Sequence, residues 1–302
     1  TFAWRLLRLL RKERIDVLHL KDPQVAIIVQ HALRAGLCST RTVLSHGTEE
    51  PSQFLKRITY LQHLAPWHRE QVEAEGIWKD TWTMIPNFVD TQRFRPGESL
   101  DLRRELSIPS EAQVLLISAA IKRRHKRIDY LIDEVQRVRQ QRPDLPVWLM
   151  IAGGQEEDTD LLIRKANEAL GVQVRFAVGF PRSRMPELYR MADLLIHGSL
   201  KEMMPMALLE ATASGLPCLV HQHSVMQWMI GPGGEALDLR VEGALAGAIV
   251  KLLDHPGRCR ELGQAAREHC VQHFSQDIVI DQILHYYRRI IDSDQCRPIA
   301  AA

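Results

Sequence analysis

The feature that most constrains the fold is a regular alternation of short β-rich runs with helical patterns from Gln113 onward. The β-rich runs, which helical segments separate, are VLLISAA, PVWLMIAGG, VQVRFAVG and DLLIHGS. Strands that alternate with helices form βαβ units, in which helices cover both faces of a parallel sheet. The sequence therefore predicts an α/β fold with a parallel sheet for this part of the chain.

The opening third of the chain repeats this alternation with the runs IDVLHL, RTVLSHG and TWTMIPN. A chain of 302 residues exceeds what one hydrophobic core usually supports, and 45% hydrophobic residues suffice for two cores. Pro96 and Gly97 interrupt the pattern before a new strand begins. We therefore expect two sheets in two domains, residues 1–110 and 111–275. The tail from Glu242 to Ile291 has apolar residues at three-to-four spacing, which predicts helices throughout.

Charge and cysteine content argue against several functional classes. Lys and Arg number 39 against 37 Asp and Glu, so bulk charge does not favour a nucleic-acid binder. The cysteines are scattered without a C-x-x-C pair, which predicts neither a disulfide framework nor a zinc ribbon but a reducing, cytoplasmic setting. They are Cys38, Cys218, Cys259, Cys270 and Cys296.

No apolar run approaches the roughly 18 to 20 residues that a membrane span needs, and the amino end shows no signal-peptide cleavage pattern. The chain begins, at Thr1, in what looks like the middle of a helix, so we expect it to be a fragment. Trp4, Leu7 and Leu10, with basic residues between them, form an amphipathic segment. A packed helix with a solvated face and a helix docked on a membrane surface both fit this pattern.

Two glutamates, Glu202 and Glu210, lie within the otherwise apolar stretch KEMMPMALLEATASGLP. Pro205 suits the first turn of a helix and Gly215 suits the position just after its end, which predicts a helix over residues 205–214. The amino end of this helix would attract an anion such as a diphosphate, because its N–H groups are unpaired there. Each carboxylate would then contact a different part of one ligand, although two solvated helix acids are the simpler alternative.

A basic run, KRRHKR from Lys122 to Arg127, directly follows the predicted strand VLLISAA. Ligands bind beyond the carboxyl ends of parallel strands, where a lysine could neutralise a diphosphate without a metal. A nucleic-acid patch and a solvated loop are alternatives. Gly153, Gly179 and Gly198 also follow predicted strands, and either a ligand or a turn with positive φ would explain each of them.

Two acid or histidine patterns suggest metal binding but have simpler explanations. Asp158 and Asp160 form DTD, yet acids are expected in the first turn of the helix that they open. His269 and His273 have a four-residue spacing that could hold a metal together with Cys270, but no further ligand or acid partner is evident. We therefore predict no metal site.

Several motifs, in the order in which they follow one another along the chain, resemble those of the family 4 retaining glycosyltransferases. They are IPNFVDTQRFRP, HKRIDYLI, PELYRMADLLIHGS and an E-x7-E that runs into EATASGLP, and they lie within residues 85–239. The resemblance implies the GT-B fold, in which two Rossmann-like domains face each other across a cleft and a nucleotide sugar is the donor. We expect a helical C-terminal tail, residues 276–302, to pack back on the first domain.

The resemblance also implies roles for individual residues. Glu210 would bond the ribose hydroxyls of the donor, and Lys126 its diphosphate. Glu202 would lie beside the donor sugar and hold its hydroxyls or stabilise oxocarbenium-like charge. His46, in LSHG, would face the sugar from across the cleft. The other expected donor-binding residues are Lys122, Arg127, Val178, Gly179, Met204, Pro205, Met206 and Ala207.

The sequence departs from the family pattern in three places. The family commonly has an Arg five residues before its lysine, but Ile121 occupies that place, so Lys122 or Arg123 would have to substitute. The small residues that usually follow the first Glu are here MMP, which narrows the approach to the sugar. The glycine-rich strand and loop that open the first domain are missing. We therefore expect an incomplete first domain, and the fragment itself could be inactive.

Together these observations predict a retaining, metal-independent glycosyltransferase without a cofactor. It would move a sugar from a nucleotide-diphosphate sugar to a glycan or lipid-linked acceptor, as in polysaccharide biosynthesis. The expected location is cytoplasmic, with peripheral contact at the inner face of the membrane, and nucleic acid is not an expected partner. A sugar-nucleotide epimerase of the same fold and a non-catalytic sugar-nucleotide-binding protein are the alternatives.

Overall fold

The structure, a computed structural model, describes residues 2–47 and 49–295. It divides into two compact units, the first made of Thr1–Asn87 with Asp277–Ala302 and the second of Phe88–Gln276. Each unit contains one sheet, and all strand pairs in both sheets are parallel. The α/β fold with two sheets that the sequence predicts is therefore confirmed.

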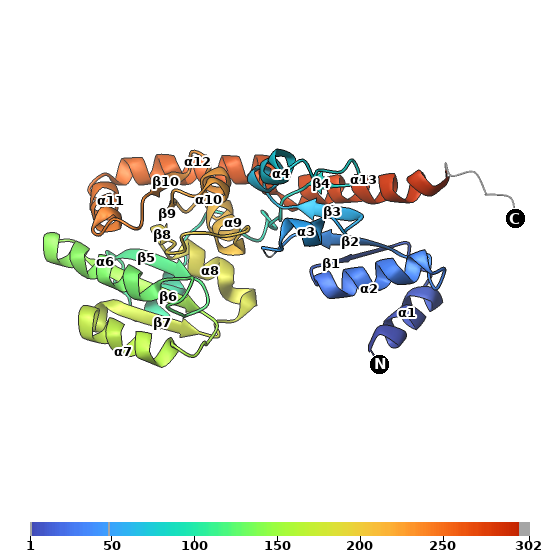
Figure 1. Ribbon diagram of the computed structural model, residues 1–302. Coiled ribbons are helices and arrows are strands. Elements are labelled where there is room, and N and C mark those ends of the chain that lie inside the picture. Colours follow the sequence, from blue (N-terminus) through green and yellow to red (C-terminus); the bar gives the residue numbers. More distant parts are fainter. Residues whose placement is uncertain (1, 48, 296–302) are drawn as a thin grey trace, which may run out of the picture. The chain divides into compact units, whose positions relative to one another are not determined.

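The first unit contains a four-stranded sheet in the order β1-β2-β3-β4 (Figure 1). Its helix α2 begins where it does because the carboxylate of Asp22 accepts hydrogen bonds from the backbone N–H groups of Gln24 and Val25, both at 2.9 Å. The strands are β1 (Val17–Leu20), β2 (Arg41–Ser45), β3 (Tyr60–His63) and β4 (Thr83–Met84). The helices are α1 (Phe2–Lys12), α2 (Pro23–Arg34), α3 (Ser52–Leu55), α4 (Pro66–Ala74) and α13 (Gln276–Gln295).

The second unit contains a six-stranded sheet in the order β10-β9-β8-β5-β6-β7. Its strands are β5 (Gln113–Ser118), β6 (Val147–Gly153), β7 (Val174–Val178), β8 (Leu194–Ile196), β9 (Cys218–His221) and β10 (Gly234–Leu237). Its helices are α5 (Leu100–Glu105), α6 (Ile128–Gln141), α7 (Thr159–Leu170), α8 (Met185–Arg190), α9 (Met206–Ala213), α10 (Ser224–Ile230), α11 (Ala244–Leu253) and α12 (Pro256–Phe274), and two 3₁₀ turns span Gly171–Gln173 and Arg182–Arg184.

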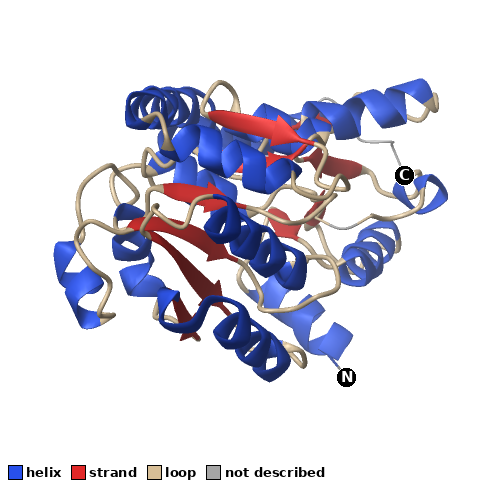
Figure 2. Ribbon diagram, turned by 90° about the vertical axis from the view of Figure 1, so that its left-hand side faces the viewer, coloured by secondary structure: helices blue, strands red, loops and turns tan. Residues whose placement is uncertain are grey.

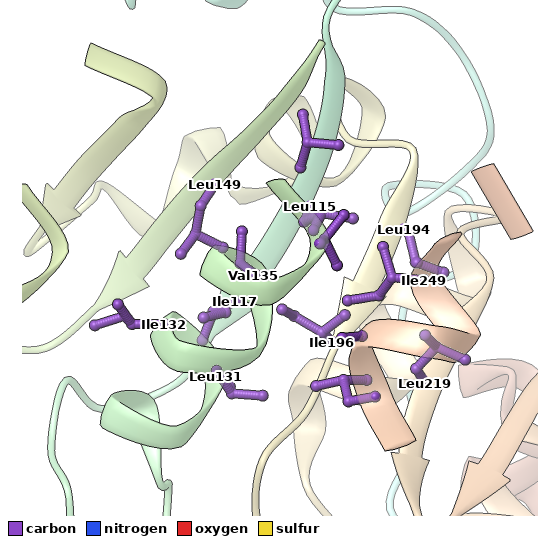
Figure 3. Packing of buried hydrophobic residues seen from close by; sticks show 14 of the residues in the cluster. Leu115, Ile117, Leu131, Ile132, Val135, Leu149, Leu194, Ile196, Leu219 and Ile249 are labelled. Carbon is purple, nitrogen blue, oxygen red and sulfur yellow. The ribbon is translucent and has the colours of Figure 1, made fainter. Parts of the chain in front are cut away.

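Helices cover both faces of the six-stranded sheet (Figure 2). Leu115 and Ile117 of β5 point to one face, where they pack with residues of α6, α7 and α11 (Figure 3). Val114 and Leu116 alternate with them and are also fully buried. Because successive side chains of a strand point to opposite faces, a sheet covered on both sides needs a continuous apolar run. The predicted strand VLLISAA, which overlaps β5, meets this requirement.

Three strands escaped the sequence analysis, namely β3, β9 and β10. Each is only four residues long, and their sequences are YLQH, CLVH and GEAL. Polar residues and a glycine dilute the apolar signal in these runs, and their position in the sheet comes from pairing with neighbouring strands. The helical prediction for the tail is confirmed by α11, α12 and α13.

The boundary between the units lies after Asn87 and not after residue 110 as expected. The segment that follows it belongs to the second unit, because its backbone is hydrogen bonded there. The N–H of Val89 donates to the carbonyl of Phe274 at 2.9 Å, and the guanidinium of Arg267 donates to the carbonyl of Phe94 at 2.9 Å. The Pro-Gly pair that suggested the expected boundary is therefore a loop inside the second unit.

The helix α13 groups with the first unit. The Tyr286 hydroxyl donates to the carbonyl of Thr81 at 2.6 Å, and the Tyr287 hydroxyl lies 2.6 Å from Nδ1 of His19. Tyr286 is buried, so this helix contributes to the core of the first unit although it is distant in sequence. Residues 296–302 of the expected C-terminal segment lie outside the described residues.

Candidate functional site

The six-stranded sheet changes its winding direction between β5 and β8. The chain runs from β5 outward through β6 and β7, then returns to β8 and continues through β9 and β10 on the other side. In open parallel sheets, ligands bind beyond the carboxyl ends of the strands at such a switch point. The loop after β5 contains the basic run 122–127, and the loop after β8 contains Glu202. The fold thus brings these two predicted elements to one place.

Glu202 lies at the centre of a buried polar cluster between these two loops. Nζ of Lys126 donates a hydrogen bond to Oε1 of Glu202. Nε2 of His197 lies 3.2 Å from the same oxygen, and Nε2 of His125 lies 3.7 Å from it. The Glu202 residue is only 9% exposed and His197 only 4%. The family resemblance implies that Lys126 and Glu202 contact different parts of a donor, and the structure joins the two residues in an ion pair.

The cluster keeps Glu202 ionised. Burial by itself raises the pKa of Glu202, but the hydrogen bond and charge of His197 and then those of Lys126 outweigh burial and hold this pKa at about 2. The side chain is therefore a carboxylate at neutral pH and carries no proton for general-acid catalysis. It can stabilise developing positive charge or accept hydrogen bonds from sugar hydroxyls.

The backbone around Lys126 has an uncommon conformation. His125 and Arg127 have φ of 71° and 51°, and they are two of only four non-glycine residues with positive φ in the described ranges 2–47 and 49–295. The Arg127 guanidinium donates to the carbonyls of Gly198 and Leu239, at 3.3 and 3.0 Å. Arg127 therefore fastens the loop after β5 to the loop after β8. Strained backbone of this kind is frequent at functional sites.

Two other residues of the basic run pair with carboxylates outside this cluster. Nζ of Lys122 lies 3.6 Å from Oε1 of Glu156, and Nε of Arg123 lies 3.3 Å from Oδ2 of Asp129. Such partly exposed pairs are weak, so both cations could turn to an anionic ligand. Ile121, which occupies the place of the family's arginine, is fully buried in the hydrophobic cluster of the second unit. Packing therefore accounts for this departure.

Close packing explains two of the glycines that follow strands. A Cβ at Gly198 would lie 2.7 Å from the carbonyl oxygen of Lys126, and a Cβ at Gly153 would lie 1.7 Å from that of Ala119. Neither residue has positive φ, so the turn explanation is wrong for both. Gly179 does have positive φ, at 67°. Gly198 thus permits the close approach of the two loops that makes the Glu202 cluster.

Val178 is the last residue of the edge strand β7, and Gly179 directly follows it. Val178 is 39% exposed, and the N–H of Gly179 donates to the carbonyl of Gly153 at 2.8 Å. This hydrogen bond holds the loop after β7 against the carboxyl end of β6. The switch point also lies at the carboxyl ends of the strands, between β5 and β8.

The helix α9 follows Glu202 and begins at the carboxyl edge of the sheet (Figure 1). It spans Met206–Ala213, with Pro205 as its N-cap residue and Gly215, at φ of 73°, just beyond its end. The predicted helix over residues 205–214 is therefore confirmed to within one residue at each end. The N–H groups of Met206 and Ala207 lie in its first turn, which offers donors to an anion. Met204, just before the helix, is buried at 6% exposure.

Glu210 lies inside α9 and is only 8% exposed. The Tyr189 hydroxyl donates to Oε2 of Glu210 at 2.8 Å and shares a second hydrogen bond, 2.9 Å long, with the hydroxyl of Ser118 at the end of β5. Burial raises the pKa of Glu210, and the Tyr189 hydrogen bond and the charges of Arg182 and Arg93 oppose this rise. Tyr189 therefore holds Glu210 in place as a hydrogen-bond acceptor near the carboxyl end of β5.

His46 lies in the first unit, directly after β2, and is 7% exposed. Its Nδ1 lies 3.3 Å from Nδ1 of His63, and its Nε2 lies 3.4 Å from Oε2 of Glu50. Burial, together with the neighbouring His46 and His68, lowers the pKa of His63 to about 3, so this ring is neutral at physiological pH. His46 thus belongs to a buried histidine cluster at the carboxyl end of the smaller sheet.

The patterns that suggested metal binding have structural roles. Oδ2 of Asp158 accepts a hydrogen bond from the N–H of Arg123 at 3.0 Å, and Nε2 of His269 lies 2.8 Å from the carbonyl oxygen of Trp228. Within residues 2–47 and 49–295, no group of three or more His, Cys, Asp or Glu side chains is arranged to hold a metal ion. Cys296 lies outside these residues, and the free thiols within them are Cys38, Cys218, Cys259 and Cys270.

The amphipathic segment near the amino end forms helix α1. Leu7 and Leu10 are buried, whereas Trp4 is 67% exposed. Trp4, Arg5, Arg8 and other residues line a cavity of about 420 Å³. Among the described residues, no helix is long and apolar enough to cross a membrane.

Sequence reasoning missed His197 and Tyr189, which hold the two glutamates. His197 lies within the predicted run DLLIHGS, directly after the last residue of β8, and Tyr189 lies in the family motif PELYRMADLLIHGS. The position of His197 at the end of a strand was a usable signal. Nothing in the sequence indicated that the Tyr189 hydroxyl would reach a carboxylate 21 residues away.

Residues 99–269, more than half of the chain, match the family of glycosyl transferases group 1. The chain belongs to this family. Among its relatives, D-inositol 3-phosphate glycosyltransferase 1 of Catenulispora acidiphila is 28% identical over 219 residues, which cover 70% of this chain and 52% of the relative. Alpha-galactosylglucosyldiacylglycerol synthase of Streptococcus pneumoniae is 25% identical over 242 residues, which cover 78% of this chain and 62% of the relative. The chain thus spans about half the length of the first of these relatives.

Solved structures resemble this chain over nearly its whole length. Sucrose-phosphate synthase of Thermosynechococcus elongatus has a TM-score of 0.81 at 18% identity, covering 97% of this chain and 78% of that one. Anabaena HepE, solved in complex with UDP, has a TM-score of 0.79 at 16% identity, covering 94% of this chain and 80% of that one. At such low identity the likeness shows the fold, and it confirms the expected two-domain GT-B class.

Proposed function

We propose that this protein transfers a sugar from a nucleotide-diphosphate sugar to a glycan or lipid-linked acceptor. The observation that carries the proposal is the meeting of Lys126, Glu202 and α9 at the switch point of the larger sheet. A cation, a helix amino end and two buried carboxylates at this point offer separate contacts for a diphosphate, a sugar and a ribose. Membership of the group 1 family supports this reading.

In this proposal Lys126 and the first N–H groups of α9, at Met206 and Ala207, hold the diphosphate. Tyr189 is hydrogen bonded to one of the two carboxylate oxygens of Glu210. The other oxygen of Glu210 accepts hydrogen bonds from the ribose hydroxyls. Anabaena HepE has been solved with UDP and with UDP-glucose, which supports a nucleotide sugar as the donor here.

The proposed chemistry needs no metal, because a lysine and helix N–H groups neutralise the leaving diphosphate. Glu202 stabilises the positive charge that develops on the sugar. We further propose that the transfer retains the configuration of the sugar, as the family resemblance implies. No cofactor other than the nucleotide sugar takes part.

A turnover assay on the full protein tests the proposal against its alternatives. The protein is incubated with UDP-, GDP- and ADP-linked sugars, with and without glycan and lipid acceptors and with a chelator throughout. Transfer predicts nucleoside diphosphate release that depends on an acceptor and continues in chelator. An epimerase would alter the sugar without an acceptor, and a non-catalytic protein would bind nucleotide without any turnover.

Removing the proposed ribose contact should weaken nucleotide binding. Glu210→Ala is expected to weaken nucleoside diphosphate binding by about 1.5 to 2 kcal/mol, because a charged hydrogen-bond acceptor is lost. Calorimetry with a nucleoside diphosphate measures this loss. Inorganic diphosphate is the control, because it has no ribose and its affinity should not change. An equal loss for both ligands would place Glu210 in the fold and not at the ribose.

For a lipid-linked acceptor, we propose that α1 contacts the cytoplasmic face of a membrane. Trp4 and Arg8 line the cavity at α1, and an aromatic side chain beside arginines suits an anionic lipid surface. Arg8→Gln is expected to weaken binding to phosphatidylglycerol vesicles by about 1 kcal/mol. Co-sedimentation measures this effect, with phosphatidylcholine vesicles as the control. Equal binding to both kinds of vesicle would exclude an electrostatic docking surface.

A further inference from the structure

The ion pair between Lys126 and Glu202 creates a competition that the proposed function must resolve. Lys126 donates to Oε1 of Glu202 in the structure, and the same ammonium is the proposed ligand of the donor diphosphate. When Lys126 turns to the diphosphate, Glu202 loses the ammonium that pairs with it but stays buried. A buried carboxylate without a partner is strongly destabilising. Some other group must therefore hold Glu202 in the donor complex.

His197 is the group placed to do so. Its Nε2 lies 3.2 Å from Oε1 of Glu202, so the ring can donate to this oxygen when Nε2 carries the proton. The backbone of His197 is fixed, because its N–H donates to the carbonyl of Leu219 in β9 at 3.0 Å. His197 is also buried, so water cannot easily replace it.

His125 is a poorer candidate, although it also faces Glu202. Its Nε2 lies 3.7 Å from Oε1 of Glu202, beyond hydrogen-bond distance, and 3.0 Å from the carbonyl oxygen of Lys201. Its side chain is 48% exposed, which lets solvent compete for the contact. The contribution of His125 should therefore be small.

We propose that His197 is a positioning residue that holds Glu202 in place when Lys126 turns from Glu202 to the diphosphate of the donor. The proposal rests on the proposed function. His197 then supports donor binding without touching the nucleotide. Glu202 opposes donor binding, because its carboxylate competes with the diphosphate for Lys126. The two residues therefore have opposite effects on affinity, and the effect of His197 depends on the charge of Glu202.

A double-mutant cycle tests this coupling. Calorimetry measures the affinity of the full protein for whichever of UDP, GDP and ADP it binds best. His197→Leu is expected to weaken binding about tenfold, because it leaves Glu202 without a buried donor. Glu202→Gln is expected to strengthen binding a few-fold, because it releases Lys126. In the Glu202→Gln background, His197→Leu should change affinity by less than about twofold, since no carboxylate then needs holding.

Two further measurements separate positioning from folding. His197→Gln retains an N–H donor and should recover most of the affinity that His197→Leu loses. Thermal unfolding of each variant reports whether the fold is intact. An equal loss from His197→Leu in both backgrounds would show that His197 acts on the nucleotide or on the fold, and would overturn the inference. No loss in the wild-type background would overturn it as well.

The failure of the proposed function gives a different result. If the wild-type protein binds no nucleoside diphosphate, or if Lys126→Ala leaves binding unchanged, the assignment of the donor site is wrong and the inference falls with it. If binding depends on Lys126 but the cycle shows no coupling, only the role of His197 is wrong.

Discussion

Glu202→Gln is expected to lower kcat by about two to three orders of magnitude, the loss typical of removing one electrostatic contact to a transition state. The substitution keeps the size of the side chain and removes its negative charge. Positive charge develops on the donor sugar during transfer, so the carboxylate should matter more in the transition state than in the ground state. Steady-state kinetics on the full protein, alongside nucleoside diphosphate affinity, measure the two effects separately.

The pKa of Glu202 determines how the turnover rate is expected to depend on pH. The folded protein depresses this pKa from its ordinary value of 4.5 to about 2. The carboxylate is therefore fully present above the ordinary value and is lost only as the pH falls toward 2. From pH 5 to 9 the wild type and Glu202→Gln should have pH–rate profiles of the same shape, displaced by a constant factor. A limb in this range that disappears in Glu202→Gln would assign Glu202 a proton-transfer role instead.

Glu187→Gln is the matched control for the turnover measurement. Glu187 lies on α8 in the same unit, and it pairs at the surface with Arg184 at 2.9 Å. Its substitution should leave kcat unchanged, because a partly exposed pair contributes little. Full turnover by Glu202→Gln would reduce Glu202 to an acid at the start of a helix, whereas a matched fall in kcat and in nucleotide affinity would assign it to donor binding.

Lys126→Ala is expected to weaken nucleoside diphosphate binding by about 3 kcal/mol, the upper end of the range for hydrogen bonds to charged groups. The affinity for the bare nucleoside should not change, because the nucleoside carries no diphosphate. Calorimetry with the two ligands gives the difference directly. Equal losses for both would show that Lys126 supports the fold through Glu202 and does not bind the diphosphate.

Arg124→Ala is the control for this second measurement. Arg124 belongs to the same basic run and is exposed. General attraction of the run for anions would make the losses from Arg124→Ala and Lys126→Ala alike. A specific clamp predicts a large loss from Lys126→Ala alone, because its ammonium is the one that lies beside Glu202 in the cluster.

Local patterns in the amino-acid sequence suffice to predict the class of fold and the position of the candidate site along the chain. The run VLLI, buried on both faces, has a local apolar signal that needs no tertiary information. Pro205 and Gly215 bracket α9 because their backbone preferences are properties of single residues. The motifs that contain Lys126, Glu202 and Glu210 likewise lie in a fixed order in the sequence.

Local signals failed where stability comes from distant partners. Strand β3, with the sequence YLQH, is formed by pairing with β2 and β4 and not by its own composition. The domain boundary lies after Asn87, earlier than expected, because Val89 is hydrogen bonded to Phe274 of α12, far along the chain. The Pro-Gly pair marked a loop correctly, but a loop becomes a domain boundary only where few contacts cross it.

The way in which the site residues combine depends on the three-dimensional fold. Lys126 and Glu202 are 76 residues apart, and they meet because β5 and β8 are neighbours at the point where the sheet reverses its winding. The same neighbourhood places His197 on Glu202 and Tyr189 on Glu210. A sequence specifies each of these side chains, but the sheet order decides which carboxylate meets which donor, because side-chain contacts between loops depend on strand pairing and not on spacing along the chain.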